Sequence, residues 1–149
     1  MSFFSNLKNL ASKASSDVAD QFSRIKNKDV MLAVVAGCTL VAYADGDVSS
    51  EEKNKMVLFL QNTETLKSFK TDEIIEAFGK FTRKFEFDKD IGKSEVLTAV
   101  GKIKNPDEAK LVMRACVIIA NSDGNFDEKE KNVVRILCQH LGLNSSEFV

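Results

Sequence analysis

The chain has 149 residues, of which 44% are hydrophobic and 29% charged, and its net charge is −1. This length can bury the core of one domain without a metal ion or disulfide bonds to hold it, and the balanced charge argues against a nucleic-acid partner. Met1 is followed by polar and aromatic residues, so we expect no signal peptide, and the apolar run 30–44 is too short to span a bilayer. The three cysteines are odd in number and lie within apolar helical patterns, which is typical of core residues in a reducing cytoplasm (Cys38, Cys116 and Cys138).

We expect two parts in the chain: a separable N-terminal arm, residues 1–28, and a main helical domain, residues 29–149. Apolar residues recur at steps of three and four, which predicts an amphipathic helix over residues 3–26. The arm carries five basic and two acidic residues, a net charge of +3. It either packs on its own bundle or docks on a partner helix or an anionic membrane surface.

Helix patterns continue along the rest of the chain, and strand signals are weak. Residues 30–44 are apolar nearly all round, which predicts a buried helix, and residues 50–61 predict an amphipathic one. Thr71 begins the next helix, "FDKDIGKSE" at 87–95 interrupts the pattern, and a further helix follows through Ile103. Asn105 and Pro106 predict the start of a helix that packs beside 30–44, and Gly142 ends a last helix over about 128–141. We therefore predict an all-α single bundle of about seven helices.

One short acidic pattern occurs twice. "ADGDVSSEEK" at 44–53 and "SDGNFDEKEK" at 122–131 both follow an apolar helix and align when the sequence is shifted by 78 positions. The preceding helices align as well, with Cys38 on Cys116. This internal repeat predicts two related helical halves about an approximate two-fold axis.

Helix capping explains most of the repeated pattern. A Ser or Asp followed three residues later by Glu is a capping box, which Ser49 with Glu52 and Asp127 with Glu130 both fit. A glycine at the end of the preceding helix supplies the left-handed exit in each copy. Capping leaves the acid before each glycine unexplained, because a carboxylate at a helix C-terminus faces the negative end of the dipole.

A divalent cation would explain those acids. Carboxylates are hard ligands suited to Ca²⁺, Mg²⁺ or Mn²⁺, and the candidate metal ligands are Asp45, Asp47, Glu52, Asp123, Asp127 and Glu130. The pattern is no EF-hand, because the twelfth loop position holds Met56 in one copy and Val134 in the other instead of a bidentate Glu. On the residues alone we favour capping and keep a weak metal site as the alternative.

No set of nucleophile, base and orienting residue can be assembled, so we expect no enzyme. His140, the single histidine, ends an amphipathic helix and suits a dipole partner better than a catalytic base. Gly92-Lys93-Ser94 resembles the end of a phosphate-binding loop, but Phe87 stands where that motif needs its first glycine.

The paired turns resemble the signature of the tellurite-resistance TerB family, and "MSFF" and "FDKDIGK" lie where a full-length member has them. The resemblance implies an all-helical, internally two-fold bundle with an acidic surface cluster, in a bacterial cytoplasmic protein of the tellurium-resistance system. It implies the membrane protein TerC and calcium-binding TerD-type proteins as partners. We expect a non-enzymatic scaffold that docks on its partners by its acidic face. The alternative is thiol-dependent redox handling of tellurite. A variant with all three cysteines replaced discriminates the two, because resistance that persists in this variant excludes the thiol mechanism.

Overall fold

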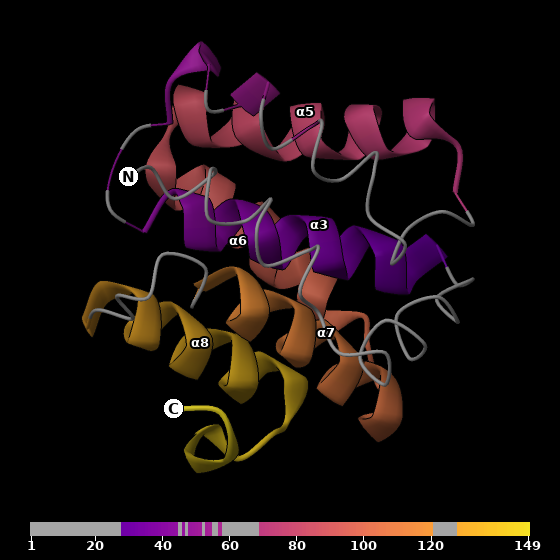
Figure 1. Cartoon of the computed structure of the whole chain (residues 1–149), viewed down its shortest axis with the longest axis vertical. Helices are drawn as coiled ribbons and strands as arrows, with labels where there is room; N and C mark the ends of the chain where they lie inside the picture. The colour runs from indigo at the N-terminus through magenta and orange to yellow at the C-terminus, as the bar shows by residue number, and fades with distance from the viewer. Residues whose placement is uncertain are drawn as a thin grey trace.

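The structure is a computed structural model that describes residues 28–44, 46, 48–51, 53–54, 57, 69–120 and 128–149, with the backbone alone for 118–120. Within these residues the helices are α3 (Lys28–Ala42), α5 (Thr71–Phe87), α6 (Lys89–Gly101), α7 (Pro106–Ala120), α8 (Glu128–Leu141) and the short 3-10 helix η2 (Ser145–Glu147) (Figure 1). The described parts of residues 50–57 are helical too, and no strand occurs in this part of the chain. The predicted all-α class is confirmed for these residues.

Helix α3 is the centre of the bundle. It contacts α5, α6, α7 and α8, and its side chains from Val30 to Val41 are buried with the exception of the half-buried Leu32. Thr39 is a polar residue inside this helix, and its hydroxyl donates to the Val35 carbonyl at 2.7 Å, which satisfies it without a partner outside the helix. The expected packing of this helix with α7 is present, but α3 alone occupies the middle, because α5 and α6 cover its other sides.

The interruption expected at residues 87–95 is present but shorter than predicted, because only Asp88 separates α5 from α6. Its carboxylate accepts hydrogen bonds from the backbone N–H groups of Asp90 at 2.9 Å and Ile91 at 3.1 Å, which caps α6. Gly92, one turn into α6, lets the two helices approach closely, since a Cβ there would lie 2.7 Å from the Phe85 Cα. A capped start and a close glycine contact thus stand where the sequence indicated a longer interruption.

Other helix ends follow local signals. Asn105 caps α7 by accepting from Asp107 N at 2.9 Å and Glu108 N at 3.2 Å, and Gly142 ends α8 with a φ of 70°, as predicted. Thr71 begins α5 as predicted, and Lys70 before it makes no side-chain cap.

Helices α3 and α7 each have 15 residues and begin 78 positions apart. They pack against each other, and both end on the left side of the view in Figure 1. The two-fold relation of the halves and the number of seven helices remain predictions. The arm helix expected over residues 3–26 lies outside the described residues, and Lys28, assigned to the arm, belongs to α3.

Candidate functional site

The two acidic turns follow α3 and α7. Because these helices contact each other and end on the same side of the bundle, the chain enters both turns from the same side (Figure 1). Glu130 is the candidate metal ligand that the structure describes. The other five lie outside the described residues: Asp45, Asp47, Glu52, Asp123 and Asp127.

The described residues of the first turn form a helix-to-helix joint. Gly46 has a φ of 126°, in the region that favours glycine, and its N–H donates to the Tyr43 carbonyl at 3.2 Å. Val48 is buried with 8% of its surface exposed and belongs to the hydrophobic core. The Ser49 carbonyl accepts from Lys53 N at 2.9 Å, so Ser49 stands at the start of the following helix as predicted.

Glu130 lies in the first turn of α8 with 2% of its surface exposed. Burial of a carboxylate is costly, and the positive end of the α8 dipole offsets part of that cost. A carboxylate held at this position can cap the helix or bind a cation entering from the turn that precedes it. The structure therefore places Glu130 where both interpretations of the repeated pattern require an acid.

The acids that form the ion pairs near the turns, Glu86 and Glu128, lie outside the candidate ligand set. Lys53 pairs with Glu86 of α5 at 2.7 Å, which ties the segment after the first turn to the bundle. Glu128 lies 3.7 Å from Lys131 and 3.6 Å from Arg135, so it neutralises basic charge on α8 itself. The pairs of Glu128 are exposed, and exposed pairs stabilise by about 0–1 kcal/mol, so they add little to stability.

No group of three or more His, Cys, Asp or Glu residues is placed to hold a metal ion within the described ranges. Since five of the six candidate ligands are outside those ranges, the ligand set remains a prediction. The chemistry of the set favours a hard cation, because every member offers carboxylate oxygen.

The three cysteines converge in the core, which the sequence did not predict. Cys38 of α3, Cys116 of α7 and Cys138 of α8 are all fully buried free thiols. A hydrogen bond with the Cys116 thiol, and then burial, raise the pKa of Cys38 well above its usual value. Burial, with smaller contributions from Cys116 and the charge of Glu147, raises the pKa of Cys138 to about 11. The alignment of Cys38 with Cys116 under the 78-residue shift was a signal that these two are related in position.

Buried thiols with raised pKa values are poor nucleophiles, because the thiolate is the reactive form. The expectation that these cysteines are small core residues is confirmed by their burial.

His140 lies in the last turn of α8. Its Nδ1 is 3.0 Å from the Ile136 carbonyl oxygen, and a carbonyl oxygen can only accept, so this nitrogen donates. A ring N–H directed at a helix carbonyl fits the role predicted for His140 at the negative end of the helix dipole.

No helix among the described residues is long and apolar enough to cross a membrane.

Comparison with known proteins gives one family. The model of the family described as "Tellurite resistance protein TerB" matches residues 31–149. The chain is 42% identical over 115 residues to the tellurium resistance protein TerB of Alcaligenes sp, an alignment that covers 76% of this chain and 94% of that protein. No solved structure matches the chain significantly.

Proposed function

Because the chain belongs to the TerB family of tellurite-resistance proteins, we propose that it acts in tellurite resistance as a non-enzymatic scaffold of the bacterial cytoplasm. In this proposal the acidic end of the bundle binds a divalent cation and docks on membrane-associated proteins of the resistance system. The observation that carries the proposal is that α3 and α7 pack together and end on the same side, where both acidic turns begin.

The cation supplies the reason for acids at two helix ends. A carboxylate beside the C-terminus of a helix costs about 0.3–1 kcal/mol when exposed, and the sequence places Asp45 and Asp123 at such ends. A cation bound at each turn would offset this cost. Without a bidentate Glu at the twelfth position, we expect dissociation constants of about 10⁻⁴–10⁻³ M, with the second turn tighter because it has Asp127 where the first has Ser49.

The proposed partners are the membrane protein TerC and calcium-binding TerD-type proteins, with the arm of residues 1–28 as a second contact at the inner face of the membrane. The net charge of +3 on the arm contrasts with the acidic turns, so the two can engage different surfaces. Partner binding is favoured over direct membrane binding for the arm, because alanines fill much of its apolar stripe.

Thiol-dependent handling of tellurite is the alternative, and the burial of the cysteines counts against it. All three thiols are inaccessible, and the pKa values of Cys38 and Cys138 are raised, so little thiolate is present to attack an oxyanion. The protein in which all three cysteines are replaced by alanine should still confer tellurite resistance. Loss of resistance in a variant that folds and accumulates normally would favour the thiol mechanism instead.

Metal binding is tested by thermal melting and calorimetry with calcium, magnesium and manganese. A cation that binds the folded state should raise the melting temperature by mass action. The variant Asp123→Asn, Asp127→Asn should lose that rise, whereas the control Asp72→Asn, Glu76→Gln removes two exposed charges of α5 and should keep it. An equal rise in both variants would contradict the proposed site.

Docking is tested by co-purification from cells with metal analysis of the complex. The intact chain should recover the membrane-associated partners, and the acid-to-amide variant should recover less of them than the α5 control. Equal recovery of the partners with the two variants would show that docking does not depend on the acidic turns.

A further inference from the structure

We propose that Cys38 of α3 and Cys116 of α7 join in a reversible disulfide when the protein meets a hydroperoxide, and that this bond locks the two helices together beside the acidic turns. The structure holds the reduced form, with both cysteines as free thiols. The proposal concerns the oxidation state of the core, so it goes beyond the function proposed above and requires no cation in either turn.

The two thiols meet across the interface of α3 and α7. Cys38 and Cys116 share a side-chain hydrogen bond, and both are completely buried. A Cβ built at Gly37 would overlap the Cys116 sulfur, so this sulfur rests against α3 one residue from Cys38. A disulfide requires the two Cα atoms to lie within about 7 Å, and a glycine at the interface allows the helix backbones this close approach.

Cys138 of α8 is the third thiol of the cluster and the less suitable partner. It interacts with Cys116 through charge, whereas Cys38 also makes a hydrogen bond with the Cys116 thiol. We therefore assign the disulfide to Cys38 and Cys116, with Cys138 left as a thiol.

The bond would lie close to the ends of both helices. Cys38 is four residues before Ala42, the last residue of α3, and Cys116 is four residues before Ala120, the last residue of α7. Four residues are about 6 Å of helix, so one cross-link holds both helices about one turn before the chain enters the acidic turns (Figure 1). A lock at this point limits the movement of the two helix ends relative to each other.

The first step is attack of the Cys116 thiolate on one oxygen of the hydroperoxide. Cys116 accepts the hydrogen bond, because a hydrogen bond that raises the pKa of Cys38 is one that the Cys38 S–H donates. The Cys116 sulfur gives an electron pair to the oxygen, the O–O bond breaks, and a sulfenic acid forms. With hydrogen peroxide, the departing hydroxide takes up the proton that Cys116 lost and leaves as water.

The second step joins the two sulfurs. The Cys38 sulfur attacks the Cys116 sulfur, the S–O bond breaks, and the departing hydroxide takes the Cys38 proton and leaves as a second water. Two thiols and one hydrogen peroxide thus give one disulfide and two waters, with the sulfurs oxidised and the peroxide oxygens reduced. Because Cys38 already contacts Cys116, this step is intramolecular and outruns further oxidation to a sulfinic acid.

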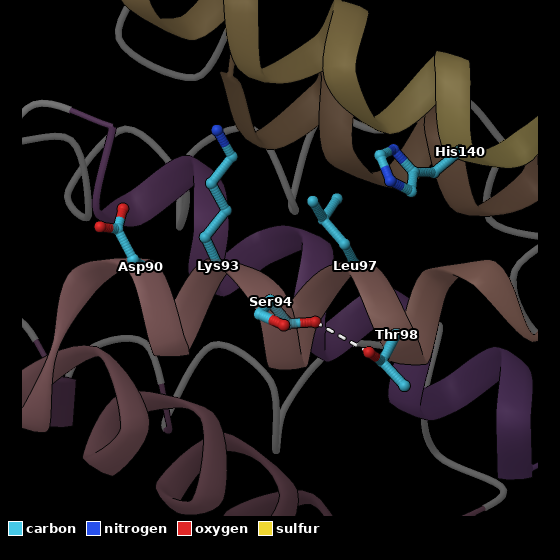
Figure 2. Close-up of a pocket in the computed structure, with 6 residues that line it drawn as sticks. All are labelled: Asp90, Lys93, Ser94, Leu97, Thr98 and His140. Atoms are coloured by element: carbon cyan, nitrogen blue, oxygen red, sulfur yellow. Dashed lines mark hydrogen bonds between the residues drawn. The ribbon is translucent and has the colours of Figure 1, made fainter.

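Burial makes the first step slow and selects the oxidant. A hydroperoxide reaches the thiols only when the contact of α3 with α7 opens locally. Hydrogen peroxide is small and uncharged, so it enters an apolar core at far lower cost than an oxyanion does. His140 does not assist as a base, because it is exposed on the surface between α8 and α6 (Figure 2). The thiols therefore stay reduced in a reducing cytoplasm and respond to sustained hydroperoxide.

The test is oxidation of the folded wild-type protein with hydrogen peroxide, then alkylation of free thiols in denaturant and mass analysis of the peptides. We expect one disulfide, between Cys38 and Cys116, with Cys138 alkylated and all three thiols recovered after dithiothreitol. The unfolded protein should instead favour the pair of Cys116 with Cys138 by about sevenfold over Cys38 with Cys116, because the loop between them is shorter. The proposal is overturned if the folded protein forms no cross-link, forms sulfinic or sulfonic acid in its place, or forms a bond that includes Cys138.

Two variants separate the pair from the rest of the cluster. Cys138→Ala is the matched control, because it removes a buried thiol of the same cluster and should still form the bond between Cys38 and Cys116. Cys116→Ala removes one partner and should form no intramolecular disulfide. Circular dichroism confirms that each variant is folded, and the peptide map of the wild type decides the assignment in any case.

The melting temperature measures the lock. A cross-link removes conformations from the unfolded chain, so the oxidised wild type should melt about 6–12 °C above the reduced protein. Cys138→Ala should show the same rise on oxidation and Cys116→Ala none. Hydrogen exchange of the amides at the ends of α3 and α7 should also slow in the oxidised form. A melting temperature that is unchanged or lower would show that the bond strains the pair, which would overturn the proposed lock.

Discussion

Gly37 and Cys116 provide a sharp test of how closely α3 and α7 pack. A Cβ added at Gly37 would overlap the Cys116 sulfur, with Leu137 Cδ1 at 3.8 Å on the other side. Forcing atoms into a filled core costs about 1–3 kcal/mol, and alanine in a helix regains about 1 kcal/mol relative to glycine. We therefore expect Gly37→Ala to lower the free energy of unfolding by up to about 2 kcal/mol instead of raising it by about 1 kcal/mol.

Replacing Cys116 should reverse that loss. Cys116→Ala alone removes a buried sulfur and should cost about 1–2 kcal/mol in lost burial and cavity formation. In the double variant the new methyl group at position 37 fills the space that the sulfur left, so the steric cost disappears. The double variant should be at least as stable as Cys116→Ala alone, which is a coupling free energy of about 1–2 kcal/mol.

Urea denaturation of the four proteins, followed by circular dichroism with a reductant present, measures this coupling. Gly101→Ala is the control, because no atom lies within 4 Å of a Cβ at that position and it should show no coupling to Cys116→Ala. If Gly37→Ala is more stable than the wild type by the full propensity gain of about 1 kcal/mol, or if its effect adds to that of Cys116→Ala, the packing argument is wrong.

Three other changes test separate features. Gly92→Ala should lower the free energy of unfolding by about 1–2 kcal/mol in urea denaturation, because the new Cβ meets the backbone of Phe85. In the control Gly79→Ala, the new Cβ meets only the flexible end of an arginine side chain, so this variant should be more stable than the wild type by up to about 1 kcal/mol. Equal effects of the two substitutions would contradict the close contact of α5 with α6. Asn105→Ala should cost about 1 kcal/mol of unfolding free energy through loss of the α7 cap, and no loss would show that the cap is dispensable. Folding raises the pKa of the Cys138 thiol from 9.0 to about 11, so this thiol ionises at lower pH in the unfolded state than in the folded state. The free energy of unfolding should therefore fall as pH rises from about 9 to 11. The Cys138→Ala protein should show a smaller fall, and a pH profile identical to that of the wild type would refute this contribution.

Hydrogen bonds between neighbours in the sequence account for the parts of the fold that could be predicted from it. The start of α7 at Asn105 and Pro106 and the end of α8 at Gly142 depend on residues within one turn of the boundary, so the signal is complete locally. The burial of α3 also follows from composition alone, because a helix apolar on every face must be enclosed.

Function was predicted from the sequence at the level of the family, through the two acidic turns. Residues 31–149 match that family. The role of the acids could not be decided in the same way, because capping and cation binding require the same residue types at the same spacing. Among the described residues, Glu130 shows the ambiguity directly: it is buried in a helix first turn, as either role demands.

The tertiary structure decided the features that depend on contacts between distant segments. The sequence pattern around Asp88 indicated an interruption, and only the contact of Gly92 with Phe85 shows two helices folded directly on each other. The convergence of the three cysteines likewise depends on how α3, α7 and α8 pack. Each helix could form from its own hydrogen bonds and apolar stripe, but the choice of partner for each face depends on the complementary shapes of side chains far apart in the chain.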